Sequence, residues 1–183
     1  MVDGRWSKRE SDVRALAIFL LTNKLFGALA WLVVRTDAKV LELDDCELGN
    51  EGAAKVAEWA KTIPFKVNIS LSNSGIDAKG AAQLADALEA DSIVHLDLSQ
   101  NQFGHEGVEL ICAALKRNAS LRSLGLAAVN AGSLGIQAIA SVLDCHPSLS
   151  DLNRSILGGR RTQSRHSAEV DVDVDFRRIR CTE

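Results

Sequence analysis

One pattern returns about every 28 residues in this chain and limits the folds open to it. Each copy has two leucines or isoleucines separated by one residue, then a turn, then a glycine. The second aliphatic residue of each pair falls at Leu43, Leu71, Leu98 and Leu126, with spacings of 28, 27 and 28. A fixed period of this length indicates a solenoid, in which neighbouring units cover each other's apolar faces.

Each unit contains two periodicities. The aliphatic pair alternates as a strand does, so both side chains share one face. After the glycine the apolar spacing becomes four, as in Leu84 and Leu88 or Ile111 and Leu115, which is typical of a helix. We therefore predict an α/β fold in which strands and helices alternate around a shared core.

The unit resembles the ribonuclease-inhibitor type of leucine-rich repeat, in which L-x-x-L-x-L-x-x-N/C-x-L-x-x-x-G precedes a full helix. The copy from Leu98 to Gly107 is the cleanest. The resemblance implies a short solenoid with a parallel sheet on the concave face and helices on the convex face. It also implies a non-catalytic module that binds a protein partner.

The chain departs from this pattern at two positions of the unit. The Asn/Cys position holds Cys46, Ser74, Asn101 and Val129, so an unbroken asparagine ladder is not expected. Ala38 and Lys66 replace the leucine that opens a unit. These departures predict an irregular stack.

Three segments are expected: an apolar capping segment (1–37), four full repeats and one partial repeat (38–157), and a polar, charged tail (158–183). In the first we predict a helix from about Ser7 to Thr22 and a strand over 28–34. Arg14, Asn23 and Lys24 interrupt this apolar stretch and disfavour a membrane span or signal peptide. Alternating Val and Asp over 170–176 leave an edge strand or an unstructured tail as alternatives.

Charge is uneven along the chain. Residues 1–35 hold six basic and three acidic groups, a net charge of +3, whereas residues 36–157 hold nine basic and sixteen acidic groups, a net charge of −7. An acidic repeat body argues against nucleic acid as a partner. A membrane partner is not expected either.

The residues with reactive side chains form no catalytic or metal-binding pattern. Four cysteines lack paired spacing, which favours reduced thiols and a cytoplasmic location. Glycosylation sequons at Asn68, Asn118 and Asn153 are the observation against that location. No phosphate-binding loop, nucleophile elbow or zinc-ligand spacing occurs. We therefore expect no enzymatic activity, no metal and no cofactor.

Outward-facing strand positions supply the candidate binding site. At one end of the concave face they are acidic: Glu42, Asp44 and Asp45, with His95 and Asp97 further along. We expect these five residues to form one cluster from adjacent strands that binds a protein partner, with a basic segment as the candidate ligand. An ordinary solvated sheet face is the alternative.

Three other functions stay open: an accessory subunit of a large assembly, a regulator like the leucine-rich-repeat GTPase activators, and a repeat fragment derived from a receptor. The loss of pattern after Leu152 motivates the last of these.

Overall fold

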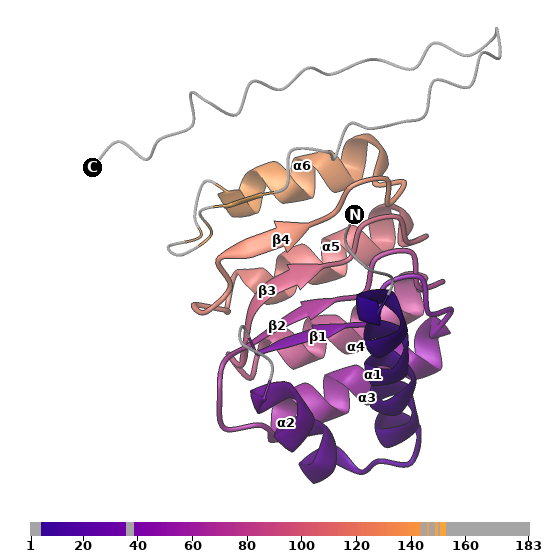
Figure 1. Ribbon diagram of the computed structural model, residues 1–183. Helices are drawn as coiled ribbons and strands as arrows, with labels where there is room; N and C mark the ends of the chain where they lie inside the picture. Colours follow the sequence, from indigo (N-terminus) through magenta and orange to yellow (C-terminus); the bar gives the residue numbers. More distant parts are fainter. Residues whose placement is uncertain (1–4, 36–38, 144–145, 147–148, 150, 153–183) are drawn as a thin grey trace, which may run out of the picture.

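The computed structural model describes residues 5–35, 39–143, 146, 149 and 151–152, and for 5–12 and 151–152 the backbone alone. Among them, five strands form one parallel sheet in chain order: β1 (Val40–Glu42), β2 (Val67–Ser70), β3 (Ile93–Asp97), β4 (Ser123–Gly125) and β5 (Asp151–Leu152). The helices that follow the first four strands form a second layer behind the sheet: α3 (Gly49–Thr62), α4 (Ala78–Leu88), α5 (Gly104–Leu115) and α6 (Gly132–Leu143) (Figure 1). The predicted α/β solenoid is confirmed.

The core lies between these two layers. The aliphatic pairs of the first four units, one residue in each strand and one just after it, are all buried, none with more than 3% exposure: Leu41, Leu43, Ile69, Leu71, Leu96, Leu98, Leu124 and Leu126. They meet buried helix residues at the predicted spacing, among them Leu84 and Leu88 of α4 and Ile111 and Leu115 of α5. Strand and helix of one unit therefore share a core with the units on either side.

The glycine that recurs in each helix permits close packing of neighbouring helices. A Cβ at Gly107 in α5 would lie 3.2 Å from both the Cα of Ala78 and the Cβ of Ala81 in α4. These distances are tighter than ordinary van der Waals contact, so a side chain there would push the two helices apart. At this position the glycine thus lets α4 and α5 approach more closely than a residue with a side chain would.

Asn101 joins two successive turns of the stack. Its Oδ1 accepts hydrogen bonds from the backbone N–H groups of Ser74 and Ile76 at 3.1 Å each, and its Nδ2 donates to the carbonyls of Leu71 and Leu98. In the preceding unit the buried Ser74 hydroxyl donates to the Leu43 carbonyl at 2.9 Å. A shorter side chain therefore substitutes in part for the asparagine.

The expected irregularity is small in the strands that the structure describes. One register shift occurs, between Val67 and Asn68 in the pairing of β2 with β3. It directly follows Lys66, which stands where a leucine would open the unit.

Asn118 is a buried structural residue and not an accessible sequon. Its side chain is 3% exposed, its Nδ2 donates to the Leu88 carbonyl at 2.6 Å, and its Oδ1 accepts from the N–H groups of Ser120 and Leu121. A glycan at Asn118 is incompatible with these contacts.

The described part of the N-terminal segment, residues 5–35, contains two helices, α1 (Arg5–Thr22) and α2 (Phe26–Val34) (Figure 1). The predicted first helix is confirmed, but the predicted strand over 28–34 is wrong. Leu29 and Val33 lie one helical turn apart and are both buried, so one face of the helix packs inward. A helix also satisfies its backbone hydrogen bonds internally, whereas a strand here would need a partner strand. The turn at Lys24, which has a φ of 54°, ends α1 and separates the two helices.

Both helices lie against the first repeat. Ala17, Leu20 and Leu21 of α1 are buried in the common core, and Lys24 forms a 3.0 Å ion pair with Glu58 of α3. These contacts support the capping role predicted for 1–37, which stays a prediction. The predicted tail (158–183), with its alternating stretch 170–176, lies outside the described residues.

We predict that Leu98→Ala lowers the free energy of unfolding by about 2–5 kcal/mol, because it leaves a cavity in the shared core. Urea denaturation followed by circular dichroism measures this loss. Leu110→Ala is the matched control: Leu110 is 42% exposed on α5, and its truncation should change stability by at most about 0.5 kcal/mol. An unchanged midpoint for Leu98→Ala would contradict the proposed core.

Candidate functional site

The strand register arranges the outward-facing residues in rows across the sheet. One row joins Val40, Asn68, His95, Ser123 and Asp151, and the next joins Glu42, Ser70, Asp97 and Gly125. Neighbouring members of a row are one strand spacing apart, about 4.8 Å. Apart from Val40 and Gly125, the row members from β1 to β4 therefore place polar residues at regular positions on the concave face.

The five predicted site residues fall into two groups. Glu42 lies on β1 with Asp44 and Asp45 just after it, whereas His95 and Asp97 lie on β3. The prediction that they come from adjacent strands is wrong, because β2 lies between β1 and β3. Glu42 and Asp97 are thus separated by two strand spacings, roughly 10 Å, with Ser70 between them.

Asp44 is tied to the second repeat. Its Oδ1 accepts hydrogen bonds from the Ser70 hydroxyl at 2.6 Å and from the Ser72 N–H at 2.8 Å. The Arg14 guanidinium of α1 donates to the Asp44 carbonyl at 3.4 Å. This carboxylate therefore holds the first two units together, a role that sequence reasoning missed and that the spacing of 28 between Asp44 and Ser72 could have suggested.

The other carboxylates differ in solvent exposure and in their hydrogen bonds to the scaffold. Asp45 is exposed and accepts from Asn73 Nδ2 at 2.7 Å. Asp97 accepts from the Ser99 N–H at 2.9 Å, and its Oδ1 occupies the space that a Cβ at Gly125 would need. Glu42 and His95 are exposed on the concave face. The acidic end is therefore a preorganised surface in which Glu42 and Asp45 are the most accessible carboxylates.

The turns after the strands repeat one backbone conformation. Asp45, Asn73, Gln100 and Ala128 occupy equivalent positions, and each has a positive φ between 49° and 60°. Asp and Asn adopt this left-handed region more readily than most residues. The side chains of these turns consequently form a further row along the edge of the concave face.

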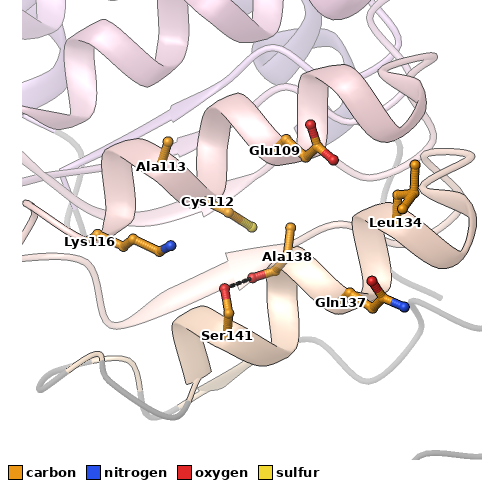
Figure 2. Close-up of a pocket in the computed structure, with 8 residues that line it drawn as sticks. All are labelled: Glu109, Cys112, Ala113, Lys116, Leu134, Gln137, Ala138 and Ser141. Carbon is orange, nitrogen blue, oxygen red and sulfur yellow. Dashed lines mark hydrogen bonds between the residues drawn. The ribbon is translucent and has the colours of Figure 1, made fainter.

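A shallow pocket lies on the convex side of the molecule. It has a volume of about 380 Å³ and lies between α5 and α6 (Figure 2). Its lining comprises Glu109, Cys112, Ala113, Lys116, Leu134, Gln137, Ala138 and Ser141. The space exists because small side chains face it from both helices. The pocket was not predicted from the sequence, although Ala113 and Ala138 are the small residues that could have indicated it.

The chemistry of the pocket does not favour nucleophilic catalysis. Burial raises the pKa of Cys112 to about 12, so its thiol stays protonated at neutral pH. Burial is also the main cause that raises the pKa of Cys46. Within the described residues, no group of three His, Cys, Asp or Glu side chains lies close enough together to hold a metal ion. The expected lack of enzymatic activity stays a prediction.

Similarity to known proteins points to one family. A model described as "Leucine Rich repeat" matches residues 39–57 and 92–112. Human NACHT, LRR and PYD domains-containing protein 13 is 38% identical over 87 residues, 47% of this chain and 8% of that protein. Two mouse proteins also match. NACHT, LRR and PYD domains-containing protein 14 is 28% identical over 69% of this chain. Ribonuclease inhibitor is 29% identical over 67% of this chain. These matches span only 13% and 27% of the two mouse proteins.

Two solved structures share the fold. Leiomodin-1 actin-binding site 2 aligns with a TM-score of 0.58 at 20% identity, covering 74% of this chain and 75% of that one. The tropomodulin C-terminal domain of Caenorhabditis elegans aligns with a TM-score of 0.58 at 17% identity, covering 76% of this chain and 80% of that one.

None of the helices described here is both long and apolar enough to cross a membrane.

We predict that Asp44→Ala lowers the free energy of unfolding by about 1–3 kcal/mol, because the Ser72 N–H and the Ser70 hydroxyl lose their acceptor. Glu42→Ala, two residues away on the same face, should change stability by at most about 0.5 kcal/mol. Thermal or urea denaturation of both variants measures the difference. Equal effects would show that Asp44 does not link the first two units.

We predict that Cys112 reacts with Ellman's reagent at pH 8 roughly a thousandfold more slowly than an unperturbed thiol, because burial lowers its thiolate fraction. The variant Cys46→Ser/Cys145→Ser/Cys181→Ser isolates this thiol. The rate should rise with pH and reach that of a free thiol in denaturant. Fast labelling of the folded protein at pH 8 would contradict the burial of Cys112.

Proposed function

The chain is a leucine-rich-repeat protein with units of the ribonuclease-inhibitor type, and from that premise we propose that it is a non-catalytic module that binds a protein through its concave face. The relatives and the fold support protein interaction as the general role. The partner and the surface that meets it belong to the proposal.

The observation that carries the proposal is the ordered acidic end of the concave face. Glu42 and Asp45 are exposed there, and Asp44 and Asp97 are held by hydrogen bonds to the scaffold. Because Asp44 and Asp97 do not need to be ordered when a ligand arrives, a basic segment meets two charges already in place. Such a surface accelerates encounter and sets orientation more than it raises final affinity.

A cytoplasmic location is part of the proposal. The described cysteines, Cys46 and Cys112, are free thiols, and the sequon asparagine Asn118 is buried. Both observations suit a reducing compartment without glycosylation.

An accessory role in a larger assembly is the second candidate. It is favoured by the exposed apolar side chains of α1 and α2, among them Phe19 and Trp31. A GTPase-activator-like role and a receptor-derived fragment rest on fold analogy alone. The leiomodin structure is named for an actin-binding site, but at 20% identity it shows the fold and gives no reason to propose actin here.

We predict that the double variant Glu42→Lys/Asp45→Lys loses partners that the parent protein recovers at low salt, because it reverses the two most accessible carboxylates. Both residues are exposed, and Asp44 is left intact so that the link to β2 remains. Crosslinking pull-downs at low and high salt, quantified by mass spectrometry, make the comparison. The parent's recovery should itself fall as salt rises, since exposed charges are screened over about 8–10 Å.

The matched control is Glu106→Lys/Glu109→Lys on α5, which changes net charge equally on the convex side, where both residues are exposed. It should recover the same partners as the parent. If the concave and convex variants behave alike, net charge and not the concave face governs binding. If all three proteins recover the same partners, the acidic end is not the binding surface.

A further inference from the structure

Exposed apolar side chains are concentrated at one end of the molecule. Among the residues that the structure describes, eight large apolar side chains are exposed, and six of them belong to α1, α2 and the turn between: Val13, Leu16, Phe19, Leu25, Trp31 and Val34. Phe19 is 57% and Trp31 61% exposed. We call these six residues the outer face.

The outer face is unusual for the end of a solenoid. A terminal unit normally turns a polar face to water. Every residue of α2 is apolar or glycine, and its inner side already buries Leu29 and Val33 in the common core. A helix that is apolar on all sides is normally covered on all sides. The outer face therefore calls for an apolar environment that the repeats do not supply.

The charged residues near the outer face indicate what kind of apolar environment would cover it. From Val13 to Arg35 the chain contains no Asp or Glu, and its charged residues are Arg14, Lys24 and Arg35. The Arg35 guanidinium packs 4.2 Å from the ring centroid of Trp31, so a cation and an exposed aromatic ring form one unit. Lys24 is partly neutralised by Glu58, which leaves Arg35 as the basic group most closely tied to the outer face.

We propose that the outer face of α1 and α2 docks the protein on an anionic lipid surface. Exposed Trp and Phe beside Arg and Lys, in a stretch of chain from Val13 to Arg35 that has no Asp or Glu, fit the boundary between acidic headgroups and acyl chains. The net charge of +3 over residues 1–35 is attracted to such a surface, and the −7 of residues 36–157 is repelled. The acidic repeats consequently point away from the lipid and keep the concave face open to a partner.

This inference revises the expectation of no membrane partner in one respect. The described helices are unsuited to crossing a bilayer, but lying on its surface requires only an exposed face. A symmetric dimer through the outer face is less favourable, because it would bring two segments of charge +3 together.

The test is flotation of the full chain with two kinds of vesicle, phosphatidylcholine alone and phosphatidylcholine with about one third phosphatidylserine. The parent should float with the anionic vesicles at least about tenfold more strongly than with the neutral ones, and less so at high salt. Phe19→Gln/Trp31→Gln should lose at least about tenfold in partitioning, since burial of each aromatic side chain drives binding. Gln is a good helix former, and both sites are exposed, so unchanged circular dichroism and melting are expected for this variant.

The matched control is Leu110→Gln/Leu134→Gln, which removes the other two exposed apolar residues, on α5 and α6. It should bind anionic vesicles as the parent does. Equal loss in both variants, or equal binding of the parent to neutral and anionic vesicles, would overturn the proposal. So would a parent that sediments as a dimer without lipid while Phe19→Gln/Trp31→Gln is monomeric, because a second copy would then cover the outer face. A monomeric parent that floats with neither vesicle would also overturn it, and would leave another protein as the occupant.

Discussion

Burial of the paired strand residues between sheet and helices is the interaction on which the other features of this structure depend. Leu96 and Leu98 illustrate it: each is at most 1% exposed, and each contributes to a core shared with the neighbouring units. Since a strand sends alternate residues to opposite faces, burying this pair also fixes which residues point outward. The concave face is thus a consequence of the core, and its polar rows are as regular as the buried leucines behind them.

Polar contacts between units refine this arrangement. Asn101 satisfies backbone groups of two turns from the inside, and Asp44 accepts from Ser70 and Ser72 on the concave side. A carboxylate on a candidate binding surface can therefore be part of the scaffold. That distinction matters for any study of binding, because reversing Asp44 would disturb the stack while reversing Glu42 would mainly change the surface.

The molecule presents two chemically different surfaces. The concave face is polar and acidic near β1, and the outer face of α1 and α2 is apolar with basic residues beside it. The Arg14 contact with the carbonyl of Asp44 joins α1, which carries part of the outer face, to the turn after β1 at the acidic end of the concave face. A protein that uses both could meet a lipid surface at its end and a protein partner along its sheet.

The sequence by itself determined the solenoid, the strand and helix of each unit, and the burial of residues such as Leu98, because local periodicity encodes them. Only the tertiary structure decided that Phe26–Val34 is a helix, that Glu42 and Asp97 lie two strands apart, and that Phe19 and Trp31 stay exposed. Each of these outcomes depends on which distant segments become neighbours. The sequence of one repeat shows which of its residues must be buried. The contacts at the ends of the stack and between units depend on segments that are distant in the sequence.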